Sequence, residues 1–181
     1  MSKIVVCPLT AVVETARIHK PSHVVTLLGP TAPPVTVEGI GPDNHLRLCF
    51  NDIAVAIEGL IMPGVEHAEG LLKFLGGWNR ERPILIHCWA GISRSTAAAY
   101  AALCMNLPDV DEAVLAMRLR RASPTATPNK LIVALADDIL GRGGRMVDAI
   151  DAIGRGQEAS EGQVFQLDVS PQPVKEISKT W

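Results

Sequence analysis

One short stretch of the chain places a cysteine, an arginine and a serine at a spacing that can do chemistry. It reads His-Cys-Trp-Ala-Gly-Ile-Ser-Arg-Ser over residues 87–95, so that five residues separate Cys88 from Arg94. An apolar run precedes it and an alanine-rich run follows, which predicts a buried strand, a tight loop and a helix N-terminus. Such a loop directs several backbone N–H groups at one point, where the helix dipole adds positive potential. The pattern predicts a loop that binds an anion such as phosphate, with Cys88 at its floor.

Cys88 is the candidate nucleophile of this loop. Helix N-termini and nearby cations favour the thiolate, which is the reactive form of cysteine. Arg94 offers a planar, two-pronged donor that matches phosphate oxygens, a geometry that lysine lacks. Attack of the sulfur on phosphorus would form a cysteinyl-phosphate and divide one difficult displacement into two easier steps. These residues therefore predict phosphoryl transfer through a covalent intermediate.

The stretch resembles the signature loop of the cysteine-based protein tyrosine phosphatases, most closely the compact dual-specificity branch, which often reads H-C-x-x-G-x-S-R-S. The histidine, cysteine, glycine, arginine and both serines of that pattern are present in residues 87–95. The resemblance continues more loosely over residues 4–140. It implies a phosphatase that hydrolyses phosphotyrosine, or has dual specificity, without a metal or other cofactor.

The resemblance also suggests roles for the residues around the nucleophile. The backbone amides that would bind the phosphate, together with the arginine side chain, belong to Trp89, Ala90, Gly91, Ile92, Ser93 and Arg94. Ser95 would donate to the departing sulfur, and could also cap the following helix. We expect His87 to orient the loop rather than to transfer protons. Gly91 would permit the sharp turn, and Trp89 would either stack on a substrate or pack within the loop.

A general acid is also needed, because an aryl or alkyl oxide is a poor leaving group. The family places an aspartate roughly thirty-odd residues before the cysteine, where it acts as this acid. Asp52 fits that interval (88 − 52 = 36) and follows a predicted strand. Asp43 is the alternative (88 − 43 = 45), inside a loop rich in glycine and proline. We expect Asp52 to be the acid, although an Asn-Asp turn could also explain its position.

Other chemistry would suit the same loop. A phosphate-binding module without turnover, sulfur transfer of the rhodanese type, and arsenate reduction are the alternatives. The Ser-Arg-Ser ending and Asp52 favour a phosphatase over the last two. Nucleotides, inositol phosphates and RNA triphosphates stay open as substrates, because a fold does not determine function.

Composition narrows the class of protein. The chain has 181 residues, of which 48% are hydrophobic and 20% charged, enough for one domain with a substantial core. A net charge of −2 gives no reason to expect nucleic acid or a membrane as partner. The four cysteines and the histidines show no metal-ligand spacing, which predicts reduced thiols in the cytoplasm and no metal. We expect a phosphorylated protein or a small phosphomonoester as the partner, and the oligomeric state stays open.

Hydrophobic patterning predicts the elements that hold the loop. Strands are expected at 4–7, 23–28, 45–50 and 83–87, and helices at 9–19, 63–75, 95–107, 108–117, 129–140 and 146–153. A short strand is a candidate at 35–37, within a loop at 29–44. This order predicts a three-layer α/β sandwich, with a mainly parallel sheet of four to five strands flanked by helices. The cysteine loop would lie beyond the carboxyl end of a central strand, where ligands bind in such sheets.

The predicted catalytic domain covers residues 1–153, and residues 154–181 form a C-terminal appendage. Residues 164–169 alternate like a short strand before two prolines. The appendage would either dock a partner or wrap its own domain. Cys49 lies close to Asp52 in the sequence, which raises the question of a reversible disulfide with Cys88.

Overall fold

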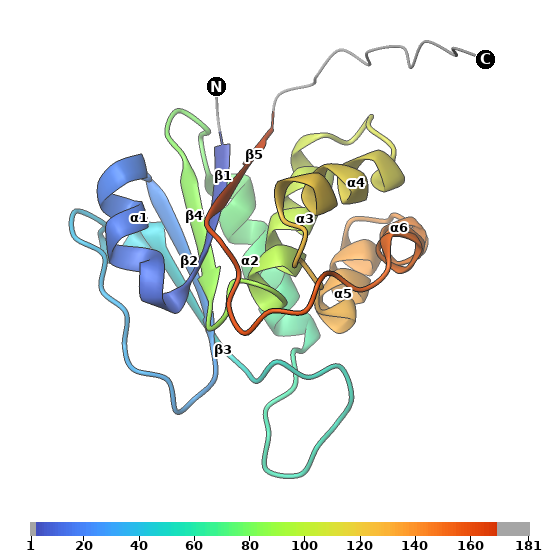
Figure 1. Ribbon diagram of the computed structural model, residues 1–181, viewed down its shortest axis with the longest axis horizontal. Coiled ribbons are helices and arrows are strands. Elements are labelled where there is room, and N and C mark those ends of the chain that lie inside the picture. Colours follow the sequence, from blue (N-terminus) through green and yellow to red (C-terminus); the bar gives the residue numbers. More distant parts are fainter. Residues whose placement is uncertain (1–2, 170–181) are drawn as a thin grey trace.

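The computed structural model describes residues 3–169 and shows a five-stranded sheet with helices on both faces (Figure 1). The parallel strands are β3 (His45–Cys49), β2 (His23–Leu28), β4 (Ile84–Cys88) and β1 (Lys3–Pro8), in that order across the sheet. A fifth strand, β5 (Phe165–Asp168), pairs antiparallel with β1 at one edge. The predicted three-layer α/β sandwich with a mainly parallel sheet is therefore confirmed.

The central strands are mostly apolar on both faces, as expected for a sheet that is covered on both sides. In β4, residues 84–86 have no solvent exposure, and the strand ends at Cys88. Parallel pairing places the carboxyl ends of β1, β2, β3 and β4 at one edge of the sheet. The cysteine loop leaves the sheet at this edge, as predicted.

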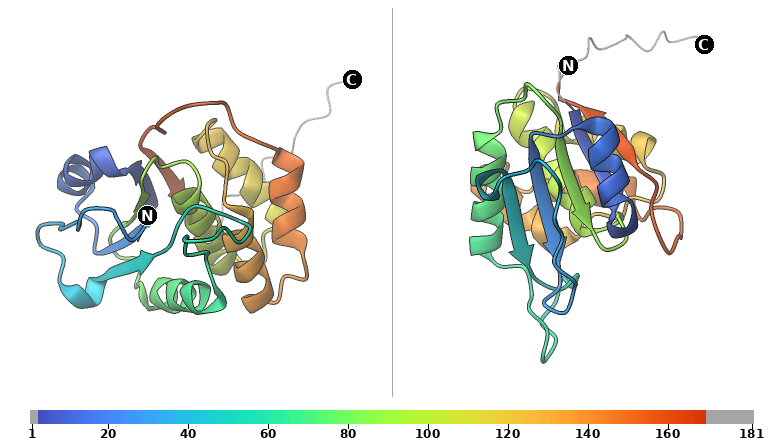
Figure 2. Two further views of the ribbon diagram at one scale, coloured as in Figure 1. Left: turned by 90° about the horizontal axis from the view of Figure 1, so that it is seen from below. Right: turned by 90° about the vertical axis from the view of Figure 1, so that its left-hand side faces the viewer.

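One face of the sheet carries α1 (Val12–His19), which follows a 3₁₀ turn at Leu9–Ala11 (Figure 2). The segment between β2 and β3 covers the rest of that face, where Val37 packs into a buried hydrophobic cluster. The candidate strand at 35–37 is absent. Pro33 and Pro34 lack the backbone N–H that a strand ladder requires, which explains the difference.

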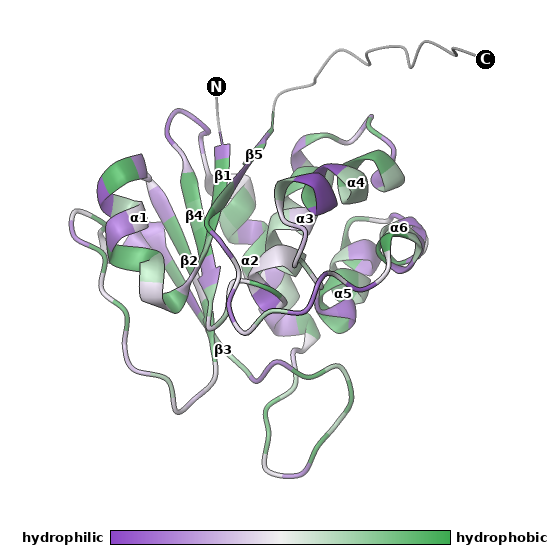
Figure 3. Ribbon diagram, in the orientation of Figure 1, coloured by the Kyte–Doolittle hydropathy of each residue, from purple (hydrophilic) through white to green (hydrophobic). Residues whose placement is uncertain are grey.

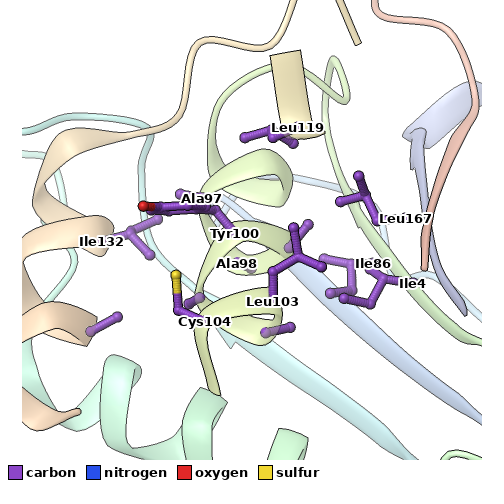
Figure 4. Close-up of a cluster of buried hydrophobic side chains, with 14 of the residues drawn as sticks. Ile4, Ile86, Ala97, Ala98, Tyr100, Leu103, Cys104, Leu119, Ile132 and Leu167 are labelled. Atoms are coloured by element: carbon purple, nitrogen blue, oxygen red, sulfur yellow. The ribbon is translucent and has the colours of Figure 1, made fainter. Parts of the chain in front are cut away.

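Five helices lie on the other side of the sheet. They are α2 (Val65–Gly77), α3 (Arg94–Asn106), α4 (Glu112–Ala122), α5 (Lys130–Ile139) and α6 (Arg145–Ile153). Helix α3 lies innermost, and residues 94–104 are all buried. Its alanines bring the helix backbone close to the sheet, so that Leu103 faces Ile4 and Ile86 (Figure 4). Colouring by hydropathy shows hydrophobic residues along much of β1 and β4 (Figure 3).

Side-chain caps define where two of these helices begin. The Asn129 side-chain oxygen accepts hydrogen bonds from the backbone N–H groups of Leu131 and Ile132 at 3.1 Å, which confirms the predicted cap. Helix α4 begins later than expected, at Glu112. The Asp111 carboxylate caps it, and the residues before it form a turn at the end of α3.

The C-terminal segment returns to the sheet, because the strand predicted near 164–169 is β5. Phe165 and Leu167 point into the core beside α4. Residues 154–168 therefore wrap their own domain, while the division of the chain at residue 153 stays a prediction. Any docking role of residues 170–181 lies outside the described residues. Within residues 3–169, no helix has the length and hydropathy needed to cross a membrane.

Candidate active site

Four carbonyl groups of the loop between β4 and α3 accept hydrogen bonds from three neighbouring segments. The backbone donors are Leu9 N to Trp89 O (3.0 Å), Gly162 N to Ala90 O (2.8 Å), Thr127 N to Ile92 O (2.9 Å) and Asn129 N to Ser93 O (3.3 Å). These four bonds come from the end of β1, the C-terminal segment and the α4–α5 connection. They fix the loop from three sides.

This anchoring leaves the N–H groups of the loop free. A trans peptide holds its C=O and N–H on opposite sides, so a carbonyl turned outward turns the next N–H inward. Residues 3–169 contain no cis peptide. The backbone N–H groups of residues 89–93 donate no hydrogen bond to any atom of these residues. The loop thus offers several unpaired donors at the N-terminus of α3, the arrangement that binds oxyanions.

Gly91 is required by both conformation and space. Its φ is +71°, a region that residues with a side chain rarely adopt. A Cβ atom here would lie 2.8 Å from the backbone nitrogen of Pro8 and 3.0 Å from the carbonyl carbon of Cys7. The loop can therefore turn this close to β1 only with glycine.

Cys88 and Ser95 face each other at the base of the loop. The Cys88 sulfur lies 3.1 Å from the Ser95 hydroxyl oxygen, and both side chains are buried. Ser95 is not the helix cap, since Ser93 occupies that position and α3 begins at Arg94. The Ser95 hydroxyl is directed at the sulfur instead.

Arg94 places a buried guanidinium beside the loop. One terminal nitrogen, Nη1, donates to the Phe50 carbonyl at 2.8 Å, which locks the group in place. Its Nε is buried and has no hydrogen-bond partner among the described residues. A buried donor without a partner is costly, and an oxygen of a bound oxyanion would satisfy it.

Asp52 lies over the same loop. Its Oδ1 accepts hydrogen bonds from the Ser93 hydroxyl at 2.8 Å and the Asn129 amide at 2.9 Å. Its Oδ2 lies 3.8 Å from Arg94 Nε and accepts no hydrogen bond within the described part of the chain. Asp43 lies in the 3₁₀ turn before β3, at the opposite end of the sheet. Of the two candidate acids, only Asp52 contacts the loop that follows Cys88.

His87 points away from the reacting atoms. It is completely buried, and its Nε2 lies 2.7 Å from the Thr26 hydroxyl, which is itself 2.8 Å from His45 Nε2. Burial lowers the pKa of His87 to about 4, so the imidazole is neutral near pH 7. Burial and the charge of Arg47 lower the pKa of His45 to about 4 as well. This geometry favours a role in holding the strand end rather than in proton transfer.

The other cysteines are poor partners for Cys88. Strand β2 lies between β3, which carries Cys49, and β4. Neighbouring strands are about 4.8 Å apart, so Cys49 and Cys88 are separated by roughly 9–10 Å, beyond the Cα distance that a disulfide spans. The fold therefore does not place Cys49 within disulfide distance of Cys88. Burial raises the pKa of Cys7 and of Cys104 to about 12, which disfavours their thiolates.

An apolar rim surrounds one side of the site. Trp89 is 59% exposed, so its indole is not part of the core, and it is free to contact a substrate. The loop from Asp52 to α2 projects from the body (Figure 2) and exposes large apolar side chains, namely Val55, Ile57, Leu60, Ile61 and Met62. The sequence motifs do not predict a role for this loop. Its signal was a run of apolar residues without the periodicity of a helix or strand.

Three supporting residues were also not assigned to the site from the sequence. Asn129 was predicted only as a helix cap, Thr26 only as part of a strand, and Thr96 only as part of a helix. The Thr96 hydroxyl donates to the carbonyls of Ile92 and Ser93. These contacts join segments that are distant in the chain, so local patterns carry no trace of them. Residues 3–169 contain no cluster of His, Cys, Asp and Glu that could hold a metal.

No family model matches the sequence, and no curated protein matches it. Solved structures do match the fold. The structure of Cydia pomonella PTP-2 phosphatase is 21% identical and has a TM-score of 0.57, over 74% of this chain and 83% of that chain. Human DUSP28 is 17% identical with a TM-score of 0.56, over 82% and 94%. A human tyrosine phosphatase-like serine/threonine/tyrosine-interacting protein is 16% identical with a TM-score of 0.56, over 76% and 90%. The chain therefore has the fold of tyrosine and dual-specificity phosphatases.

Two substitutions of Asn129 separate its two contacts. In Asn129→Asp the side-chain oxygen still caps α5, but the amide donor is replaced by a carboxylate that repels Asp52. If the loop hydrolyses phosphomonoesters, we expect kcat on para-nitrophenyl phosphate to fall at least tenfold in this variant, with little change in thermal stability. Asn129→Ala should lose both the turnover and about 1 kcal/mol of stability, because the cap is lost. Equal turnover in Asn129→Asp and wild type would show that Asp52 needs no support from this amide.

The buried histidines predict a loss of stability in mild acid. The folded-state pKa of His87, about 4, lies below the unfolded value of about 6.5, so the unfolded chain binds more protons between these pH values. The contribution of neutral His87 to the free energy of unfolding is fully present above pH 6.5. It falls by about 3 kcal/mol as the pH drops to 4. Urea unfolding at pH 7.5 and pH 5 measures the slope. His87→Gln should unfold with a shallower dependence on pH; an unchanged slope would exclude His87 as its source.

Proposed function

We propose that the chain is a metal-independent phosphatase that hydrolyses phosphomonoesters, on phosphotyrosine or with dual specificity, through a cysteinyl-phosphate at Cys88. The observation that carries the proposal is the set of unpaired donors around this sulfur. They are the loop amides and the buried Nε of Arg94. Charge spreads over the phosphate oxygens during phosphoryl transfer, and fixed donors stabilise that charge more than mobile water does.

The first step transfers the phosphoryl group to the enzyme. The Cys88 sulfur attacks phosphorus in line with the leaving oxygen, so that an S–P bond forms as the P–O bond breaks. Arg94 Nε and the loop N–H groups hold the equatorial oxygens. Asp52 Oδ2, which accepts no hydrogen bond from the described residues, carries the proton that passes to the leaving oxygen.

The second step returns the enzyme to its starting state. Asp52, now a carboxylate, removes a proton from a water molecule whose oxygen attacks phosphorus. The S–P bond breaks, inorganic phosphate forms, and the electron pair returns to the Cys88 sulfur. The Ser95 hydroxyl, 3.1 Å from that sulfur, stabilises the thiolate as it leaves. A thiolate that must stay reduced, together with four unpaired cysteines, supports a cytoplasmic location.

A phosphate-binding module without turnover is the alternative. The human tyrosine phosphatase-like serine/threonine/tyrosine-interacting protein has the same fold, and its name calls it phosphatase-like rather than a phosphatase. The fold alone therefore does not establish catalysis. The position of Asp52 favours turnover, because a protein that only binds phosphate has no use for an acid above the loop.

Replacement of the nucleophile tests the reaction itself. Wild-type protein should release phosphate from para-nitrophenyl phosphate in the presence of EDTA, and Cys88→Ser should release none above background, because the hydroxyl is a far weaker nucleophile. Absorbance of the released nitrophenolate measures both. Activity that requires a divalent cation, or that survives in Cys88→Ser, would contradict the mechanism. Equal binding of a phosphopeptide by both proteins, with no phosphate released by either, would support the binding module.

Replacement of the acid tests its assignment. Asp52→Asn should lower kcat on a phosphotyrosine peptide by about 10²- to 10⁴-fold, because the leaving tyrosinate oxygen receives no proton. The loss should be smaller on para-nitrophenyl phosphate, whose leaving group is more acidic. Asp43→Asn is the matched control and should retain wild-type kcat on both substrates. A larger loss in Asp43→Asn than in Asp52→Asn would reverse the assignment.

A further inference from the structure

The C-terminal segment after α6 runs past the catalytic loop before it enters β5 (Figure 1). We call residues 154–164 the strap. We propose that the strap holds the phosphate-binding loop in place through its backbone at Gly162, which is a positioning residue for that loop. This inference rests on the proposed function, but it concerns a segment that the predicted catalytic domain does not include.

The strap is fixed at its start by the connection between α4 and α5. Arg120 donates through Nη2 to the Gly154 carbonyl at 2.7 Å and through Nη1 to the Pro124 carbonyl at 2.8 Å. The backbone N–H of Gln157 donates to the same Pro124 carbonyl at 2.9 Å. Gly156 packs so tightly that a Cβ atom would lie 2.5 Å from the carbonyl carbon of Thr125. At its far end the strap continues into β5, which is hydrogen-bonded to β1.

Between these two attachments the strap reaches the catalytic loop at Gly162. The Gly162 N–H donates to the Ala90 carbonyl at 2.8 Å, which orients the peptide group between Ala90 and Gly91. The N–H on the other side of that peptide belongs to Gly91, and it is therefore turned toward the space above Cys88. Gly162 acts on a bound oxyanion only through this peptide group.

The approach is close enough to exclude a side chain. A Cβ atom on Gly162 would lie 3.1 Å from the Gly91 carbonyl oxygen, 3.3 Å from Ile92 Cγ1 and 3.4 Å from the Ala90 carbonyl oxygen. These distances are tighter than ordinary van der Waals contact, so the loop or the strap must shift by a few tenths of an ångström. Small displacements of catalytic donors are known to reduce rates strongly.

The test compares Gly162→Ala with two controls. Gly77→Ala adds the same methyl group where nothing lies within 4 Å, and Glu161→Ala changes an exposed side chain of the strap while it keeps the backbone N–H groups. We expect Gly162→Ala to lower kcat/KM on para-nitrophenyl phosphate about tenfold and to weaken inhibition by inorganic phosphate to a similar extent. Both controls should match wild type. Thermal unfolding of all four proteins shows whether the fold is intact.

The outcomes separate the strap from the enzyme. Wild-type kcat/KM and phosphate affinity in Gly162→Ala would overturn the role of Gly162 while the proposed function stands. A lower unfolding temperature with unchanged phosphate affinity would make the strap merely structural, and would also overturn it. If wild type releases no phosphate from the ester, the proposed function fails, and calorimetric titration with inorganic phosphate still compares the binding of wild type and Gly162→Ala.

Discussion

The outward anchoring of the loop carbonyls is the interaction on which the rest of this site depends. Four carbonyls of residues 89–93 accept hydrogen bonds from surrounding segments, and this alone turns the intervening amides inward. A free loop of this length would pair its amides with water or with its own carbonyls, and an anion would then have to reorganise it. Here that cost is met during folding, so the donors are in place before an anion arrives.

The same anchoring explains why the Asp52 carboxylate and the Arg94 guanidinium lie where they do. Asn129 bonds the Ser93 carbonyl through its backbone and Asp52 through its side chain, while its side-chain oxygen caps α5. One residue thus joins a helix start, the catalytic loop and the carboxylate. Arg94 is held from the other side by the Phe50 carbonyl, two residues before Asp52. The segment after β3 therefore positions both charged groups.

Much of this arrangement could be predicted from the sequence, and the reasons differ between elements. The apolar strand, the tight loop and the alanine-rich helix around Cys88 are contiguous, so local patterning was enough. The expectation for Asp52 rested on its interval of 36 residues before Cys88, which the resemblance suggested, and on its position after a predicted strand. The roles of Thr26 and Gly162 could not be predicted, because each depends on contacts between distant segments. The prediction of a strand at 35–37 was wrong because it relied on the β-branched residues there and gave too little weight to the two prolines before them.

Strand β5 has a further consequence for the behaviour of the molecule in concentrated solution. An unpaired sheet border offers N–H and C=O groups to any other extended chain, which is a common route to aggregation. Because β5 occupies the outer side of β1, the two borders of the sheet within residues 3–169 are β3 and β5. Strand β5 is four residues long, and β3 is five residues long and carries Arg47, which are features that discourage pairing with a second molecule. Loss of the C-terminal strand would replace the short β5 border with the longer, apolar border of β1.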